Sequence, residues 1–390
     1  MPTKIAPDVL SWASILDDQT RDQAATTGSM PFVAPHLALM PDAHLGKGAT
    51  VGSVIPTDRA IIPAAVGVDI GCGMIAVRTQ WTTDQIRAAG PLSTLREGIE
   101  RRVPVSAGVY NDTITDTAQE RITALEEQWP TLGTPDRYAR NWRQQLGTLG
   151  GGNHFIEITA DETATVWAFL HSGSRGVGNK IAQHHIKTAQ AVAKRYWINL
   201  PDPDLAYLVE GTTEFDQYIA ELRWAQDFAL ANRAEMMDRT IDALTEHMGS
   251  PVEQLESIQC HHNWTDREHH MGRDLWISRK GAIRARVGDA GLIPGSMGTA
   301  SYVVQGKGNP ASFHSAPHGA GREYSRAAAR KKFTADDLRS AMVGIEYRDS
   351  DAFIDEIPAA YKDIDQVMAD ASDLVEIRHT LHQIVNVKGD

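Results

Sequence analysis

The sequence is poor in cysteine and lacks any long hydrophobic run. Cys72 and Cys260 are the two cysteines among 390 residues, which excludes a disulfide framework and favours a reducing cytoplasm. No run of about 18 apolar residues occurs, and Met1 to Leu10 lacks the basic-then-apolar pattern of a signal peptide. These absences argue against a membrane protein, a membrane partner and Sec secretion.

Positive charge is also scarce, because 38 Lys and Arg face 50 Asp and Glu for a net charge of −12. Taken alone, this value argues against a nucleic-acid partner. The deficit is uneven, however: residues 271–332 hold 11 basic and three acidic side chains, a local charge of +8 that leaves −20 for the remainder. A basic segment in an acidic protein is typical of a local anion site, although a solvated basic face has the same pattern.

The length predicts one large elaborated domain or two small ones. Short apolar segments and glycine turns lie on both sides of a helical block, in which helices are expected over 179–197 and 213–248 from three- and four-residue apolar spacing. Repeats, low-complexity tracts and long linkers are missing. We therefore predict one α+β domain over residues 1–390, with a helical excursion at about 179–250.

Hydrophobic patterning also predicts several smaller elements. Strands are expected over 64–70, 74–78, 166–170 and 384–389, and surface helices over 80–102 and 113–129.

A tight glycine turn separates Asp69 from Cys72 in Asp69-Ile70-Gly71-Cys72-Gly73. The segment 71–76 matches the loose dinucleotide pattern G-x-G-x-x-A, but its glycines should open a helix and the following residues resemble a strand. Asp69 and Cys72 are alternatively metal ligands presented by the turn. An inert buried cysteine is the other interpretation of Cys72.

Histidines occur in three further polar clusters, at 150–155, 170–175 and 260–264. Carboxylate, thiolate and imidazole donors together suit a borderline transition metal such as Mn²⁺, Fe²⁺ or Zn²⁺. Five donors exceed one tetrahedral site, so a thiolate shared by two metals fits the pattern.

Glycine-rich turns recur within the basic segment, at 295–298, 306–309 and 318–322. Glycines let backbone N–H groups approach an anion, and Arg322 can bind a phosphate bidentately. A neutral His318 beside them can attack phosphorus and become a covalent phosphoramidate. A purely structural turn would have the same local sequence.

These clusters, in this order, resemble the RtcB family of RNA-splicing ligases over nearly the whole chain. The blocks that carry the resemblance are Pro41–Gly48, Val66–Gly73, Gly151–Glu157, His171–Gly176, His261–Asn263, Gly295–Gly298, His318–Arg322 and Val387–Gly389. The resemblance implies a single domain of mixed short strands around a metal cleft.

The resemblance also implies a reaction: a GTP- and Mn²⁺-dependent RNA ligase that acts in RNA splicing or RNA repair. Its substrates would be RNA ending in a 3′-phosphate or 2′,3′-cyclic phosphate and RNA beginning with a 5′-hydroxyl. It would proceed through a guanylylated histidine and an RNA-ppG intermediate, and an activating protein partner is allowed for.

Carried over by position, the resemblance assigns three groups of residues. The ligands of two Mn²⁺ would be Asp69, Cys72, His154, His171 and His262, with the Cys72 thiolate bridging. His318 would be the nucleophile that carries GMP, with Asp42 and Arg322 as further catalytic residues. The guanylate would lie among Asn153, Phe155, Glu157, Ser296, Arg322, Tyr361 and Lys388, with Glu157 accepting hydrogen bonds from the guanine edge.

Two other functions remain open at this point. A dinuclear metal phosphoesterase or cyclic phosphodiesterase would keep the metal ligands without guanylylation. A module that only binds RNA ends would need no covalent nucleophile, which the presence of His318 disfavours.

Overall fold

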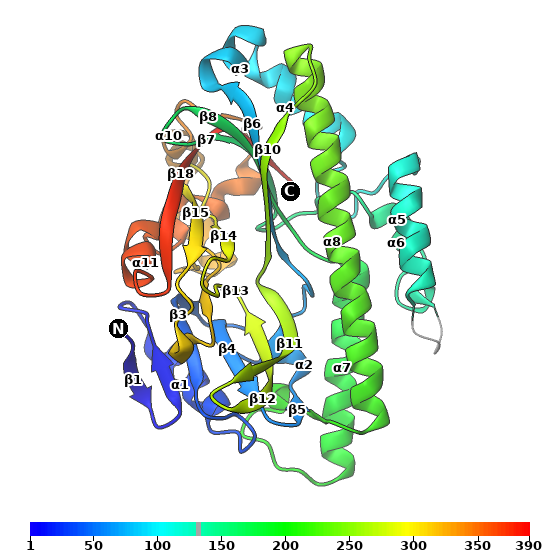
Figure 1. The fold of residues 1–390 in the computed structure, drawn as a ribbon, viewed down its shortest axis with the longest axis vertical. Helices are drawn as coiled ribbons and strands as arrows, with labels where there is room; N and C mark the ends of the chain where they lie inside the picture. Colours follow the sequence, from blue (N-terminus) through cyan, green and yellow to red (C-terminus); the bar gives the residue numbers. More distant parts are fainter. Residues whose placement is uncertain (130–133) are drawn as a thin grey trace.

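Two β-sheets, most of whose central strands are buried along nearly their whole length, share a core (Figure 1). The computed structural model describes residues 1–129 and 134–390. The first sheet has the order β1 (Thr3–Ala6), β2 (Val9–Ser11), β3 (Leu37–His44), β4 (Val51–Thr57), β12 (Arg273–Lys280), β11 (Asn263–His270). The second has the order β10 (Gln254–His261), β6 (Gly73–Thr82), β8 (Thr165–Ser172), β7 (Phe155–Ala160), β18 (Val375–Lys388), β15 (Ser301–Gly306), β14 (Ala290–Ile293), with β17 (Glu346–Tyr347) paired to β18. Two small pairs complete the described strands, β13 (Ala282–Arg284) with β16 (Ser315–Pro317) and β5 (Ala60–Ile61) with β9 (Leu208–Val209).

The period-two alternation of β6 shows where the cores lie. Met74 and Ala76 join Val54 and other residues of the first sheet in one buried cluster. Ile75 and Val77 point the other way, into a second buried cluster with side chains of α4 and α8. The second sheet is therefore covered by the first sheet on one face and by helices on the other.

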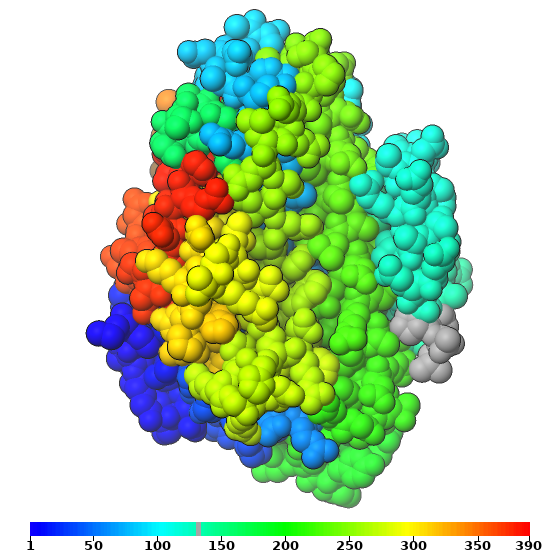
Figure 2. Space-filling view, viewed as in Figure 1, coloured from blue at the N-terminus to red at the C-terminus, as the bar shows by residue number. Residues whose placement is uncertain are grey.

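The helix α8 (Thr213–Met248) runs along the long axis of the molecule beside α7 (Arg175–Arg195) (Figure 1). Its first turn is capped by the Thr212 side chain, and it ends at Gly249, whose φ of 64° is left-handed. Figure 2 shows α5 and its neighbours as a lobe on the outer side of this helical layer. The remaining helices are α1 (Asp18–Gly28), α2 (Pro63–Val66), α3 (Thr83–Ala89), α4 (Leu92–Arg102), α5 (Asp116–Glu127), α6 (Trp142–Gln145), α9 (Arg326–Lys332), α10 (Ala335–Ala341) and α11 (Ile364–Asp370). Short 3₁₀ helices are η1 (Pro135–Arg137), η2 (Pro203–Leu205), η3 (Pro310–Ser312), η4 (Asp351–Glu356) and η5 (Pro358–Ala360).

The predicted α+β class and the helix over 213–248 are confirmed. The strand predicted over 64–70 is wrong: Pro63 opens the short helix α2, and a glycine-containing loop follows it. A short buried apolar run does not distinguish strand from helix, and Pro63 fits the first turn of a helix. The helix expected from residue 179 begins at Arg175, and the stretch 80–102 starts with the last residues of β6.

None of the described helices is both long and apolar enough to cross a membrane.

Candidate active site

The five predicted metal ligands meet at one end of the second sheet. In its register Gly73 pairs with both Ser172 and His261, and Phe155 pairs with His171, so four strands start or end together. Each ligand sits at such a strand end: Asp69 and Cys72 before β6, His154 before β7, His171 at the end of β8, and His262 after β10. The strand pairing thus brings together residues that are far apart in the chain.

Their donor atoms form two sets that share Cys72. One set is Asp69, Cys72 and His154, the other is Cys72, His171 and His262, and the atoms of each set lie within 4.8 Å of one another. The Cys72 Sγ lies 3.3 Å from His171 Nε2 and 3.6 Å from His154 Nε2. This arrangement fits a thiolate bridging two cations.

The imidazole rings are oriented by backbone carbonyls. His154 Nδ1 lies 3.1 Å from the Leu149 carbonyl oxygen, and His171 Nδ1 lies 3.1 Å from that of Asn153. A carbonyl oxygen can only accept a hydrogen bond, so these contacts place the N–H at Nδ1 and leave the lone pair on Nε2. His171 Nε2 is 2.9 Å from His262 Nε2, a pairing of ring nitrogens that a cation bound by both would satisfy.

Burial sets the protonation of these groups. Burial lowers the pKa of His171 and His262 well below the usual range, and the neighbouring histidine rings lower it further. Burial alone would raise the pKa of Asp69, but hydrogen bonds with the His154 ring and the Ser174 N–H hold it below its ordinary value. Burial raises the pKa of the Cys72 thiol, and metal coordination would deprotonate it.

Gly173 is required for this packing. A Cβ at that position would lie 2.2 Å from Asp69 Oδ1, so any other residue would displace the carboxylate from the donor set.

Sequence reasoning missed Arg233, which lies behind the donor sets on α8. Its side chain is fully buried. Its guanidinium donates to the carbonyls of Gly71 at 2.6 Å and Ser172 at 2.9 Å, next to Cys72 and His171. Arg233 therefore ties together the two loops that carry these ligands. Its place in a 36-residue helix gave no motif by which to find it.

His318 follows β16 and is held by Asp42 of β3. Asp42 Oδ2 lies 2.6 Å from His318 Nδ1 and also accepts the backbone N–H groups of His318 and Gly319 at 3.1 and 3.3 Å. The carboxylate fixes the proton on Nδ1, so the lone pair is on Nε2. The His318 ring is 4.5 Å, centroid to centroid, from that of His262, so His318 lies beside the donor sets.

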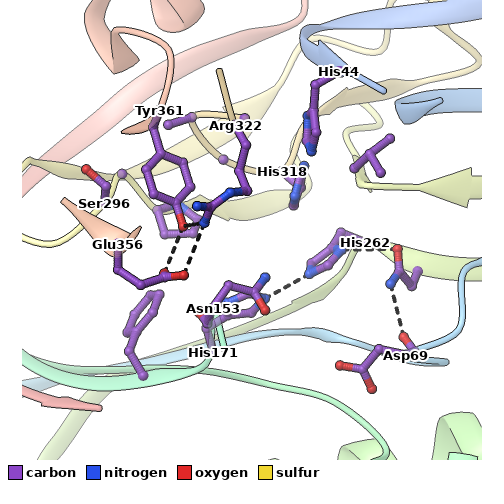
Figure 3. A pocket seen from close by; sticks show the side chains of 18 of the residues that line it. His44, Asp69, Asn153, His171, His262, Ser296, His318, Arg322, Glu356 and Tyr361 are labelled. Atoms are coloured by element: carbon purple, nitrogen blue, oxygen red, sulfur yellow. Dashed lines mark hydrogen bonds and ion pairs between the residues drawn. The ribbon is translucent and has the colours of Figure 1, made fainter. Parts of the chain in front are cut away.

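One cavity of about 340 Å³ joins these parts (Figure 3). It is lined by His318, by Asp69, His171 and His262, and by all seven residues predicted to surround the guanylate: Asn153, Phe155, Glu157, Ser296, Arg322, Tyr361 and Lys388. Cys72, His154 and Asp42 are buried behind its wall. The structure thus brings together every residue predicted for the site, while their roles stay predictions.

Glu356, at the end of η4, organises one wall of the cavity and was not predicted. Its carboxylate accepts from Arg326 at 2.6 Å, Tyr361 OH at 2.8 Å and Arg322 at 3.1 Å, and it pairs with Lys388 Nζ at 3.1 Å. Burial would raise its pKa, but the neighbouring cations hold it below its ordinary value. Glu356 is therefore an anion that fixes three cations.

Arg322 makes more hydrogen bonds to protein groups than its predicted role in phosphate binding suggests. Its Nη1 donates to Glu356 and to Tyr361 OH, its Nη2 donates to the Asp355 carbonyl at 2.7 Å, and its Nε donates to the Tyr324 carbonyl at 3.1 Å. Figure 3 shows its guanidinium beside Tyr361 and Glu356. Its orientation toward the cavity is thus fixed by the protein.

Comparison with known proteins agrees with this site. The family model described as "tRNA-splicing ligase RtcB" matches residues 23–389. The chain is 47% identical to the RNA-splicing ligase RtcB of Escherichia coli K12, over 96% of this chain and 95% of that protein. It is 30% identical to the tRNA-splicing ligase RtcB of Pyrobaculum aerophilum, over 94% and 90%, and 30% identical to the RNA-splicing ligase RtcB of Mycobacterium tuberculosis, over 89% and 94%. The chain belongs to the RtcB family.

Proposed function

We propose that this protein is an RNA ligase that joins RNA 3′-phosphate or 2′,3′-cyclic phosphate ends to 5′-hydroxyl ends, using GTP and two Mn²⁺. The relatives above are named as RNA-splicing or tRNA-splicing ligases. The observation that carries the proposal is the placement of His318: Asp42 holds its Nδ1, and the residue lines the same cavity as Asp69, His171 and His262 of the two donor sets. A cytoplasmic location and an activating protein partner stay predictions.

The first step uses the His318–Asp42 pair. The Nε2 lone pair attacks the α-phosphorus of GTP, a P–N bond forms, and the bond to the β-phosphate oxygen breaks so that pyrophosphate leaves. The proton stays on Nδ1, where the Asp42 carboxylate balances the positive charge that develops on the ring. The product is GMP held covalently on His318.

The next two steps pass GMP to RNA and then release it. An oxygen of the RNA 3′-phosphate attacks the α-phosphorus, the P–N bond breaks, and His318 is restored as RNA-ppG forms. The 5′-hydroxyl oxygen then attacks the RNA 3′-phosphorus, GMP leaves, and the hydroxyl proton is released to solvent. A cyclic phosphate must first be opened by water to a 3′-phosphate.

The residues present fit two cations and a guanylate. The Nε2 atoms and the shared thiolate converge on one region, as a metal centre requires. Bound divalent ions would polarise phosphoryl oxygens and lower the pKa of the attacking hydroxyl. Among the described residues, buried Glu157 Oε2 has no hydrogen-bond partner, so it is available to accept the N–H of guanine N1.

The direct test is incubation with α-labelled GTP and Mn²⁺, followed by the addition of RNA halves bearing 3′-phosphate and 5′-hydroxyl ends. We expect an acid-labile labelled protein and then joined RNA. A protein that hydrolyses cyclic phosphate without forming the adduct would instead be a phosphoesterase.

Replacing Asp42 with asparagine should slow guanylylation by about 10²- to 10⁴-fold, because the amide no longer fixes the proton on His318 Nδ1. Adduct formation at saturating GTP measures this rate. Metal content should stay unchanged, since Asp42 belongs to neither donor set. An Asp42→Asn enzyme with the wild-type rate would contradict a role in holding the nucleophile.

Guanine recognition should depend on pH through Glu157. Burial raises the pKa of Glu157 to about 8, partly offset by the Lys388 charge and the Asn386 hydrogen bond. GTP binding that needs the carboxylate should therefore strengthen roughly tenfold per pH unit below 8 and level off above it. Glu157→Gln, which cannot ionise, serves as the control for the titration of GTP itself.

The raised pKa of Glu157 also makes the stability of the fold depend on pH in a defined direction. A carboxyl with a raised folded-state pKa stabilises the fold most below its ordinary value of 4.5 and loses that contribution as pH rises through about 8. Unfolding midpoints of wild type and Glu157→Gln across this interval should diverge in that direction. Parallel pH profiles for GTP binding in the two proteins would contradict the assignment of Glu157.

A further inference from the structure

The helix α9 carries the one run of three consecutive basic residues in the sequence, Arg330-Lys331-Lys332. Four of its seven residues are cations and the other three are alanines, so the helix has no acidic side chain. In a protein with a net charge of −12, this concentration of positive charge indicates a surface that meets an anionic partner. The reaction steps proposed above make no use of Lys331 or Lys332.

The first residue of α9 lies at the mouth of the cavity. Arg326 lines the cavity, yet its side chain is 45% exposed. Its guanidinium also lies beside Gly152, where a Cβ would be 3.4 Å from Nη2. An α-helix rises 1.5 Å per residue, so Lys332 is about 9 Å along the axis from Arg326. The helix therefore connects the cavity mouth to exposed cations on the surface.

The four cations of α9 differ in whether a carboxylate compensates their charge. Arg326 and Arg330 pair with Asp355 at 2.8 and 2.7 Å. Lys331 has no hydrogen-bond or ion-pair partner within residues 1–129 and 134–390, and Lys332 has no carboxylate partner there. The two lysines thus carry positive charge that the described part of the protein leaves uncompensated.

Two aromatic rings hold Lys332 in place. Its Nζ lies 4.0 Å from the ring centroid of Tyr324 and 5.3 Å from that of Phe333, and it donates to Tyr324 OH. The two rings contact each other edge to face at 5.7 Å. A cation that is already ordered loses less conformational entropy on binding an anion than a free lysine does. The Tyr324 carbonyl accepts from Arg322 Nε, which ties this ordered cation to the cavity wall.

Lys331 lies on the outer face of α9. It is four residues after Ala327 and three after Ala328, so all three share one side of the helix, whereas Ala329 is fully buried. Both Ala327 and Ala328 are exposed. No long side chain on this face therefore keeps a polymer backbone away from Lys331.

We propose that the outer face of α9, with Lys331 and Lys332, binds the phosphodiester backbone of the RNA strand whose 3′-phosphate enters the cavity. The inference rests on the proposed reaction, in which this strand becomes joined to the guanylate as RNA-ppG. Because α9 begins four residues after Arg322, in the wall predicted to surround the guanylate, the strand joined to the guanylate leaves the cavity beside α9. Backbone contacts of this kind bind RNA of any sequence.

The test is the affinity for a labelled single-stranded RNA of about ten nucleotides that ends in a 3′-phosphate. Fluorescence anisotropy in the presence of Mn²⁺ measures it over a range of salt concentrations. Replacing both lysines, Lys331→Gln with Lys332→Gln, should weaken binding by about tenfold at low salt, because two phosphate contacts are lost. The slope of log affinity against log salt should become shallower by about 1.4, the value for two contacts to a single strand.

Matched variants separate a lost contact from a general effect of charge. Lys331→Arg with Lys332→Arg keeps both cations and should bind as wild type does. Lys187→Gln with Lys194→Gln removes the same charge from exposed positions of α7, outside the cavity lining, and should also keep the wild-type affinity.

Lys331→Gln alone keeps the test decisive if the double variant fails to fold. Its side chain is exposed and makes no hydrogen bond or ion pair with the described residues, so the fold should tolerate the change. It should weaken binding by about threefold, the effect of one lost phosphate contact.

A second RNA of the same length, with a 5′-hydroxyl and a 3′-hydroxyl end, tests which strand is bound. Its affinity should change by less than about threefold in the double variant, because no 3′-phosphate holds it in the cavity. Weakening of the 3′-phosphate RNA that the arginine variant does not share supports the inference. Equal weakening of both RNAs overturns the assignment to the 3′-phosphate strand.

Two other results are distinguishable from these. Unchanged affinity for both RNAs in the glutamine variants overturns α9 as an RNA-binding surface and leaves an acidic protein segment as its occupant. A wild-type protein that binds the 3′-phosphate RNA through Lys331 and Lys332 but forms no GMP adduct overturns the proposed reaction, while RNA binding by α9 stands.

Discussion

Replacing His318 with alanine is expected to abolish the labelled GMP adduct and to reduce ligation by a factor of at least about 10³, since removing a covalent nucleophile leaves no route through this intermediate. The imidazole Nε2 is the atom that would form the P–N bond, and Asp42 holds the ring in the tautomer that exposes it. Gel analysis after incubation with α-labelled GTP measures the loss.

Metal binding should survive this change, because His318 belongs to neither donor set. His314→Ala is a matched control: this half-buried histidine lies four residues earlier, outside the cavity lining, and its ring packs against His270. The control should label like wild type. An undiminished adduct in His318→Ala would rule out the proposed nucleophile.

Replacing Cys72 with alanine should remove metal and guanylylation together, because its Sγ is the one donor shared by both sets. Loss of outer-sphere groups alone weakens metal sites by about 10- to 100-fold, so loss of a bridging ligand should exceed this range. Elemental analysis of protein equilibrated with limiting Mn²⁺ gives the stoichiometry, and adduct formation gives the activity.

Cys260→Ala provides the comparison for a buried thiol that is not a ligand. Cys260 contacts the Leu292 carbonyl at 3.8 Å and packs in the core, so its variant should keep metal and labelling. If Cys72→Ala bound metal with the wild-type stoichiometry, Cys72 would not be a ligand and would instead be an inert buried side chain.

The sequence predicted the site residues more completely than it predicted the helices and strands around them. Local sequence marks many of the site residues, whereas other residues matter only through tertiary packing. Asp69 and His154 lie in glycine-containing turns, and His171 lies at the end of a strand just before another, so glycine and polar residues mark all three locally. Arg233 and Glu356 carry no such mark, because their importance comes from tertiary packing: one lies within a long helix and the other at the end of a 3₁₀ helix.

The net charge of the basic segment 271–332 overstates the unpaired positive charge that faces the cavity. Much of its positive charge is paired in the fold: Arg273 with Asp58 at 2.6 Å, and Arg330 with Asp355 at 2.7 Å. Lys280, Arg322 and Arg326 do line the cavity, but the Glu356 carboxylate engages both arginines. The summed charge therefore pointed to the right region without identifying the groups that face the cavity.

The convergence of four strand ends on the donor sets has a consequence for folding. A cation bound there would act as a cross-link between segments separated by up to nearly half the chain, since Asp69 and His262 lie on opposite sides of the two long helices in sequence. Such a link would close large loops and would favour the native state over the unfolded chain, so metal loading and folding would be thermodynamically coupled. Cells that limit the metal would then limit both the chemistry and the lifetime of the folded protein.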